Sequence, residues 1–459
     1  MIGVYGILLS LLLLMYLAYR GVSVIILAPL LALLAVMIAG EGQMILGVYT
    51  EVFMNGVVGF IKKYFPIFLL GAVFGKLMQD SGSARAIAQT ILRKLGRKHA
   101  ALSIVLACAI LTYGGVSAFV VAFAVYPLAA AMFREADMPK RFVPAAIALG
   151  AFTFTMTCLP GTAQIHNIIP TSYFGTTIYA APVVGLVSGM VIMLLGLVWI
   201  NRQIRRSGDE GYGRGHTQEP EMLADDNLPG FWVAIVPILT VMLVSFLFTT
   251  FWLPMMDTSY LADARFGATD VKKVQGIWSM IVSLFAANIM VAMLNFRRFK
   301  SLNRSVTAGA LGSMLPTFNT GSEVGYGVTI ASLAAFAIVK EAVLNVAPGN
   351  PLLSEVVAIN VLAGITGSAS GGLSIALEAL GDTYYQLATQ YHIPLEWMHR
   401  LASMASGGFD TLPHNGAVIT LLTICGLTHR QSYKDIAVVS LLIPVMVTLL
   451  AAFVLSLQF

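Results

Sequence analysis

Two short clusters of polar residues interrupt apolar stretches of this 459-residue chain and contain its best candidates for chemistry. The first reads CLPGTAQIHN over 158–167, and the second reads GGFDTLPHNGA over 407–417. Pro and Gly break helices, and each new helix N-terminus offers free backbone N–H groups and a partial positive charge, which suit a carboxylate. The clusters therefore predict a site for a small organic anion. Their candidate substrate-binding residues are Gly161, Thr162, Gln164, Asn167, His414 and Asn415.

Two turns rich in small residues lie at the middle of the apolar stretches 101–133 and 352–385. They read TYGGVSAF over 112–119 and ITGSASGG over 365–372. We interpret the two stretches as re-entrant hairpins, because irregular backbone at membrane depth is tolerated where protein or water satisfies its polar groups. Small residues at the tips let the backbone approach a ligand, and the hydroxyls can donate to it. The candidates here are Gly114, Gly115, Ser117, Thr366, Gly367, Ser368 and Ser370.

Three acidic residues fall inside apolar segments, namely Glu323, Glu378 and Asp410. Burying a charge in a membrane is costly, so such acids are functional candidates. Asp410 and His414 are four residues apart, which places them on one face of a continuing helix. Such a pair could titrate near neutral pH and couple proton movement to transport. The alternative is that the pair caps the broken helix ends, and His166 is a further candidate for proton coupling.

Composition assigns the chain to the membrane. Hydrophobic residues make up 58% and charged residues 11%, with mean hydropathy +0.83, whereas soluble domains carry about 25% charged residues. We therefore predict an all-α polytopic membrane protein. The net charge of +5 indicates a positive-inside bias and not a nucleic-acid partner. Cys108, Cys158 and Cys425 lie in apolar segments without metal spacing, so no disulfide framework, metal or cofactor is predicted.

Apolar runs predict about ten crossings plus the two hairpins. With the N-terminus outside, most Lys and Arg residues fall in cytoplasmic loops, and Arg400 is among the few left outside. Both termini are then periplasmic. The segment 2–19 precedes its flanking Arg20, so we expect a spanning helix there and not a signal peptide. The predicted spans are 2–19, 22–39, 57–79, 142–170, 181–200, 231–252, 276–295, 306–340, 395–424 and 435–457.

The polar segment 201–230 divides the crossings into equal halves. Each half has an odd number of crossings, so the second is predicted to be inverted relative to the first. The segment 64–92 parallels 315–340, and in each half a hairpin and a broken span follow. We predict a first repeat over 1–200, a cytoplasmic linker over 201–230 and a second repeat over 231–459.

The order of these motifs resembles the gluconate permease family of proton symporters, within a broader ion-transporter superfamily. The resemblance extends over roughly 60–457 and rests on ILTYGGVSAFVVAFAVYPLAAAMF, CLPGTAQ, GITGSASGG and LPHNGA. It implies proton-driven uptake of a sugar acid such as gluconate, or a short hydroxy acid such as 3-hydroxybutyrate, across a bacterial inner membrane. It also implies a homodimer with an elevator mechanism. The scaffold would comprise 2–39 and 231–295, and the transport domain mainly 57–200 and 306–457.

The family's functional positions transfer residue by residue to three motifs of this chain. The proline- and glycine-rich break matches Pro160, Gly161 and Thr162, the hairpin tip matches Gly367 and Ser368, and the second break matches His414 and Asn415. The family's first break usually has a His followed by several prolines, and its first tip is often aromatic and acidic. Here those positions read CLPG and YGGVSAF. Fewer polar groups favour a smaller, less hydroxylated acid.

The sequence thus predicts a secondary active transporter with H⁺ as the coupling ion and Na⁺ left open. Its partners are a small organic acid, membrane lipid and a second copy of the chain, with no nucleic acid. A cation/proton antiporter is the alternative, although it needs acids in both halves and the first half has none at its break or tip. A membrane-embedded enzyme is a remote alternative. Asp410 and His414 lie near Ser406, but no nucleophile motif occurs.

Overall fold

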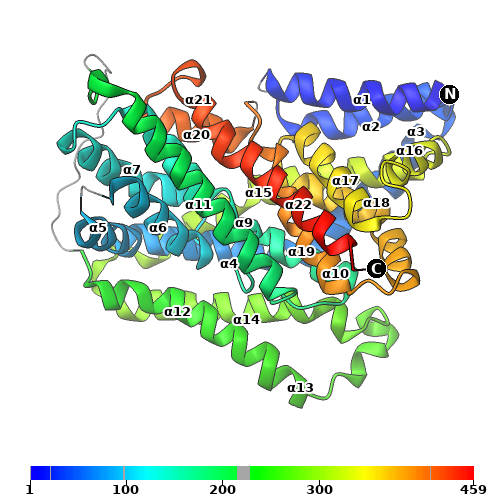
Figure 1. Ribbon diagram of the computed structural model, residues 1–459. Coiled ribbons are helices and arrows are strands. Elements are labelled where there is room, and N and C mark those ends of the chain that lie inside the picture. Colours follow the sequence, from blue (N-terminus) through cyan, green and yellow to red (C-terminus); the bar gives the residue numbers. More distant parts are fainter. Residues whose placement is uncertain (1, 21, 97–98, 214–227, 414, 459) are drawn as a thin grey trace.

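The computed structural model describes residues 2–20, 22–96, 99–213, 228–413 and 415–458, and regular structure within them is entirely helical (Figure 1). This confirms the all-α class. Six helical segments in this part of the chain are long and apolar enough to cross a membrane, or seven if one sharply bent pair counts as a span. The layout of about ten crossings with two re-entrant hairpins stays a prediction, because several predicted spans are shorter or broken helices.

The first half of the chain ends with a long apolar helix. Its helices are α1 (Ile2–Tyr19), α2 (Val24–Ile38), α3 (Ile45–Gly47), α4 (Met54–Asp80), α5 (Ser83–Leu95), α6 (Ala100–Tyr113), α7 (Ala118–Glu135), α8 (Val143–Ala151), α9 (Phe154–Thr157), α10 (Ile165–Phe174) and α11 (Pro182–Arg206). A wide helical turn over Val48–Phe53 leads into α4.

The second half begins after the segment 201–230, much of which lies outside the described residues. Its helices are α12 (Phe231–Leu247), α13 (Leu253–Met255), α14 (Val271–Leu294), α15 (Leu302–Ser332), α16 (Phe336–Leu344), α17 (Pro351–Thr366), α18 (Ala369–Gln390), α19 (Leu395–Ser406), α20 (Gly416–Cys425), α21 (His429–Ala437) and α22 (Ile443–Ser456). The wide turns Phe248–Trp252 and Val438–Leu442 continue α12 and α21.

The order of helices repeats between the halves. In each half a helix pair comes first (α1–α2, α12–α14), and a long helix with a shorter one follows (α4–α5, α15–α16). A two-helix hairpin (α6–α7, α17–α18), a broken helix and a final long helix complete each half. The packing repeats as well, since α4 lies against α15, α14 packs on α4, and α2 packs on α15. α10 contacts α18 of the other half, and α20 contacts α7.

Three predicted spans are not continuous helices. The predicted span 306–340 bends by 99° between α15 and α16, where Leu333 takes an extended backbone conformation. The predicted span 142–170 is divided into α8, α9 and α10, and 395–424 into α19 and α20. The two breaks lie at 158–164 and 407–415, where Pro and Gly interrupt the helical hydrogen bonding.

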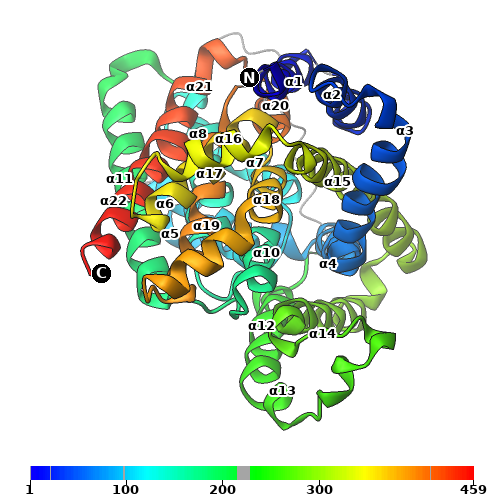
Figure 2. The same ribbon diagram turned by 90° about the vertical axis from the view of Figure 1, so that its right-hand side faces the viewer.

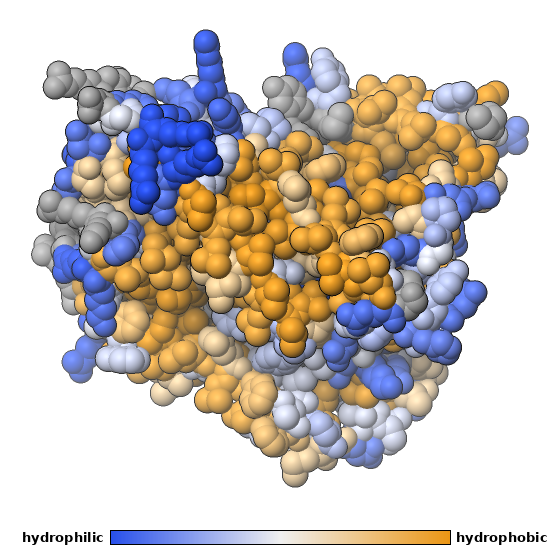
Figure 3. Space-filling view, viewed as in Figure 1, coloured by the Kyte–Doolittle hydropathy of each residue, from blue (hydrophilic) through white to orange (hydrophobic). Residues whose placement is uncertain are grey.

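The apolar surface and the cores agree with a membrane location. α11 and α22 lie side by side across the face in Figure 3 and carry a broad apolar surface bounded by hydrophilic residues. Exposed side chains on them include Val183, Met190, Val198, Leu450 and Phe453. α1, α2, the start of α4 and α15 enclose a small apolar core of their own. In Figure 2, α12, α13 and α14 project at the bottom of the view, away from α1 and α2 at the top.

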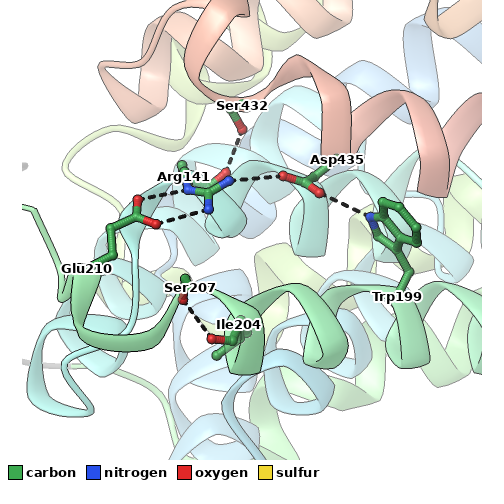
Figure 4. A network of polar contacts seen from close by, with 7 residues as sticks. All are labelled: Arg141, Trp199, Ile204, Ser207, Glu210, Ser432 and Asp435. Carbon is green, nitrogen blue, oxygen red and sulfur yellow. Dashed lines mark hydrogen bonds and ion pairs between the residues drawn. The ribbon is translucent and has the colours of Figure 1, made fainter.

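A polar network joins the two halves near the start of α8 (Figure 4). Arg141 donates to both carboxylate oxygens of Glu210 at 2.8 and 3.0 Å and lies 3.6 Å from Asp435 of α21. The hydrogen bond with Glu210 raises the pKa of Arg141. Trp199 of α11 donates to Asp435 at 3.1 Å, and Ser432 donates to the Arg141 carbonyl. The network fixes α11 and α21 to one another through the segment before α8.

Candidate functional site

The tip of the first hairpin is bonded directly to the first helix break. The Tyr113 hydroxyl donates to the Pro160 carbonyl at 2.7 Å, and Gln164 Nε2 donates to the Thr112 carbonyl at 2.6 Å. The Ala163 N–H donates to the Tyr113 carbonyl at 3.3 Å. Three bonds therefore hold the turn between α6 and α7 against the segment between α9 and α10, two parts of the chain predicted separately as site components.

The second hairpin tip and the second break are joined in the same way. Asn415 Nδ2 donates to the Gly367 carbonyl at 2.7 Å, and Asn415 Oδ1 accepts from the N–H groups of Ala417 and Val418 at 2.6 and 3.0 Å. Asn415 is thus the N-cap of α20 and also the link to the tip between α17 and α18. Its side chain is 7% exposed.

The two links occupy corresponding places in the two halves. Gln164 is the residue before α10 and Asn415 is the residue before α20, and each amide donates to a hairpin-tip carbonyl. The tips also begin helices, since Ser117 caps α7 and Ser368 caps α18. Four helix N-termini therefore lie at the two tip-and-break units, and each unit offers the partial positive charge that favours an anion.

Two glycines meet conformational requirements that other residues do not. Gly161 has φ +77° and its N–H donates to the Ile178 carbonyl at 2.9 Å. A Cβ there would collide with the Tyr179 ring and approach the Tyr113 hydroxyl. Gly367 has φ +64° and ends α17, which turns its carbonyl toward Asn415. Both positions need the left-handed backbone region that glycine enters without steric cost.

A buried guanidinium supports the first break from the other half. Arg400 of α19 is fully buried and donates to Asn167 Oδ1 at 2.9 Å and to the Ala180 carbonyl at 2.8 Å. Asn167 Nδ2 in turn donates to the Ile178 and Thr162 carbonyls at 2.8 and 3.2 Å. Arg400 was predicted on the outer side of the membrane, and that placement stays a prediction; its side chain does not extend into solvent. Its long side chain instead pairs with carbonyls that the irregular segment before α11 leaves free.

His399 completes this cluster. Its Nδ1 lies 2.6 Å from Thr176 Oγ1, and its Nε2 lies 3.3 Å from Asn167 Oδ1. Asn167, a predicted substrate-binding residue, therefore has both ends of its amide engaged by the protein. The structure places it as a support of the break, and its oxygen is shared by Arg400 and His399.

The three candidate acids have different surroundings. Glu323 of α15 is 3% exposed, and its Oε2 has no hydrogen-bond partner among the described residues. Asp410 lies in the short helical turn Phe409–Thr411, is 5% exposed, and its Oδ1 likewise has no partner in the described chain. Glu378 is exposed and accepts from the Tyr173 hydroxyl at 2.5 Å. Of the three, Glu323 and Asp410 are therefore buried, as is Glu355 of α17, whose two carboxylate oxygens also have no partner among the described residues.

The other predicted residues divide into bonded and unbonded groups. Thr366 donates to the Leu362 carbonyl within α17, and Ser370 lies 3.5 Å from Thr320 of α15. Thr162 is fully buried and His166 is 8% exposed, yet Thr162 Oγ1 and His166 Nδ1 have no partner within the described residues. Gly114 packs against Ile238 of α12, and Gly115 lies next to Ala163. His414 lies outside the described residues, so its pairing with Asp410 stays a prediction.

Sequence reasoning missed Tyr113, His399 and Arg400. Tyr113 sits inside the TYGG motif that marked the tip, so an aromatic hydroxyl beside two glycines was a usable signal. His399 and Arg400 lie within the predicted span 395–424, where an Arg is costly unless it is paired. That cost was the available signal, but the partners at 167 and 178–180 are more than 200 residues away in sequence.

Residues 1–319 match the sequence profile described as GntP family permease. A transporter of Bacillus subtilis named YxjC, described as uncharacterized, is 46% identical over 451 residues and 95% of each chain. The chain belongs to the GntP permease family. A high-affinity gluconate transporter of Escherichia coli is 29% identical over 198 residues, 41% of each chain. This GntP-family protein is therefore a multi-pass membrane transporter, as its sequence predicted.

Solved transporter structures share the fold. The YdaH transporter of Alcanivorax borkumensis superposes with TM-score 0.55 at 15% identity, over 91% of this chain and 89% of that one. MtrF of Neisseria gonorrhoeae gives TM-score 0.55 at 14% identity, over 92% and 84% of the two chains. These similarities support the helical architecture of the GntP-family chain.

Proposed function

We propose that this transporter imports a small organic anion together with a proton. The observation that carries the proposal is the pair of tip-and-break units, in which four helix N-termini lie beside amide-linked hairpin tips. Backbone N–H groups at such ends bind carboxylates without any arginine in direct contact. The buried Arg400 beside the first break adds a positive charge to the same region.

The substrate class is a short monocarboxylate or hydroxy acid, such as 3-hydroxybutyrate, with a sugar acid such as gluconate as the larger candidate. The similarity to an Escherichia coli gluconate transporter supports an organic acid. Of the two threonines proposed as contacts, Thr366 is bonded within its own helix, which leaves Thr162 Oγ1 as the one without a partner among the described residues. A site with few free polar groups gains little from pairing the additional hydroxyls of a sugar acid. This supports the shorter acid.

We assign substrate contact to the tips and breaks, and proton coupling to buried ionisable groups. The proposed contacts are Gly114, Gly115, Ser117, Gly161, Thr162, Gln164, Asn167, Thr366, Gly367, Ser368, Ser370, His414 and Asn415. Asp410, His166 and His414 are the sequence-based candidates for coupling. Asp410 is buried and its Oδ1 has no partner within the described residues, which supports its candidacy.

We also propose the arrangement that the repeated helix order supports. Two inverted repeats would form a scaffold from 2–39 and 231–295 and a moving transport domain mainly from 57–200 and 306–457, in a homodimer in a bacterial inner membrane with periplasmic termini. The separate apolar core around α1 and α2, and the position of α12 and α14 at one side of the molecule (Figure 2), support this division.

The test is uptake by proteoliposomes. Labelled 3-hydroxybutyrate and gluconate are offered with an inward proton gradient, an inward sodium gradient, or neither. Accumulation of one acid with the proton gradient alone is the expected result. Accumulation that needs sodium refutes the proton coupling, and no accumulation of either acid by folded protein under any gradient refutes the substrate class.

A further inference from the structure

Glu323 points at the N-terminus of a hairpin helix. It lies on the face of α15 that also presents Thr320 and Gly327 to α18, since these residues are separated by three and four positions. A Cβ added to Gly371 would coincide with the Glu323 carboxylate, and the Ser368 side chain lies beside this carboxylate. The Glu323 side chain is 3% exposed, with Oε2 unpartnered among the described residues.

In the second unit, an anion would bind at the N-terminal end of α18. Ser368 caps the helix by accepting from the Gly371 N–H at 3.0 Å, and the preceding Gly367 carbonyl is bonded to Asn415. Free N–H groups of a first helical turn favour a carboxylate. The protein thus places its own carboxyl group at the position that suits the carboxylate of a substrate.

We propose that Glu323 and the substrate carboxylate compete for the N-terminus of α18, so that the anion binds only when Glu323 is protonated. The inference rests on the proposed function, and it identifies Glu323 as the group that carries the coupled proton. Two carboxylates at one buried helix end repel each other when both are ionised. Glu323 takes a proton from the outer solution as the anion binds, and it releases that proton inside after the anion leaves. One monocarboxylate then crosses with one proton, so the cycle moves no net charge.

The other ionisable groups around Glu323 make no bond to it in the described part of the chain, so we assign the coupled proton to Glu323. The short helix α2 carries no ionisable residue, and the turn Val48–Phe53 carries Tyr49 and Glu51, which are exposed. Tyr326 of α15 is bonded to Ser10 of α1. On the side of Val324, ionisable groups of α4, α10 and α18 line a cavity of about 40 Å³; they are Lys63, Tyr64, Tyr173 and Glu378. Tyr173 is bonded to Glu378, and no bond from any of these groups to Glu323 occurs in the described part of the chain.

The first half lacks an equivalent acid. When Pro66 of α4 is aligned with Pro316 of α15, the position of Glu323 corresponds to Val73. The neighbouring Gly75 of α4 lies close to the Ser117 N–H at the tip of the first hairpin, as α15 lies close to the second. At these aligned positions only the second half has an acid beside its tip, which supports a single coupled proton.

The decisive variant is Glu323→Gln, because glutamine has nearly the shape of a protonated glutamate but cannot ionise. In proteoliposomes, the wild-type protein should accumulate the acid with a proton gradient, without an effect of membrane potential. Its apparent affinity should fall about tenfold per pH unit once Glu323 ionises, the limit for one linked proton. Glu323→Gln should bind the acid with an affinity that does not change with pH. It should exchange internal for external acid, and it should lose accumulation driven by protons.

Three outcomes overturn the proposal. The first is a Glu323→Gln protein that still accumulates the acid with a proton gradient. The second is a folded Glu323→Gln protein that no longer binds the acid. The third is Asp410→Asn abolishing the pH dependence while Glu323→Gln keeps it, which assigns the proton to Asp410. Failure of the proposed function gives a different result from these three. In that case the wild-type protein itself shows no proton-driven accumulation of either acid.

Discussion

Replacing Asn415 with leucine should disable the second unit while leaving the protein folded. Leucine has a similar size but removes the donor to the Gly367 carbonyl at 2.7 Å and the acceptor for the Ala417 and Val418 N–H groups. Loss of an N-cap costs about 1 kcal/mol, and a buried carbonyl left without a donor costs roughly 1–2 kcal/mol more. The tip geometry is therefore destabilised by about 2–3 kcal/mol, which corresponds to a roughly 30- to 150-fold weaker affinity for the substrate.

The assay is binding and uptake of the transported acid by purified protein, with thermal unfolding as the measure of folding. Asn415→Ser keeps an N-capping side chain but cannot reach across to the tip, so it should lie between the wild-type protein and Asn415→Leu. Thr423→Leu is the matched control, because Thr423 lies on the same helix, is exposed and bonds only within α20. Near-normal affinity in Asn415→Leu, with Thr423→Leu also normal, would refute the assignment of this tip to the substrate site.

Three further predictions concern the supports of the site. Arg400→Met removes the donor to Asn167 and Ala180 and should lower the free energy of unfolding by about 3 kcal/mol. Arg400→Lys should recover only part of the lost stability, as measured by thermal unfolding. Tyr113→Phe removes the bond to Pro160 and should raise the half-saturating substrate concentration about fivefold, for about 1 kcal/mol lost; an unchanged value would exclude a role of the first break in binding. Glu210→Gln should change stability by less than about 0.5 kcal/mol, because its pair with Arg141 is partly solvent-screened (34% and 42% exposed). Chemical denaturation of the two proteins measures that difference.

The breaks in the chain were predictable because their causes are local. Gly115, Gly161 and Gly367 adopt positive φ values, and Pro160 and Pro413 cannot continue a helix. The helix order and the family could likewise be derived from the sequence, since hydrophobic runs and repeated motifs are properties of neighbouring residues. The bend between α15 and α16 has no such residue, because Leu333–Ala335 contains neither Gly nor Pro, and it was therefore missed.

The contacts that build the site could not be derived in this way. Arg400 bonds to Asn167 and Ala180 across more than 200 residues, and its burial depends on carbonyls that only the folded segment before α11 exposes. Glu323 was recognised as a candidate acid, but its position beside Gly371 depends on how α15 packs along α18. A sequence identifies which groups are costly to bury, whereas the fold decides which partner satisfies them.

The two halves share the same order of helices and breaks. They differ in the side chains at the breaks and tips, which could couple the transport cycle to protons. Gln164 and Asn415 make the same link to a hairpin tip, but only Asn415 also caps its helix. The first break is held by Tyr113 and Arg400, whereas Glu323, whose Oε2 has no partner among the described residues, faces the second tip. In the first unit several bonds join the tip to the break, whereas a buried carboxyl group with an unpaired oxygen changes its energy when a proton or an anion arrives. We therefore expect substitutions in the first unit to change affinity at every pH, and substitutions of Glu323 to change how affinity depends on pH.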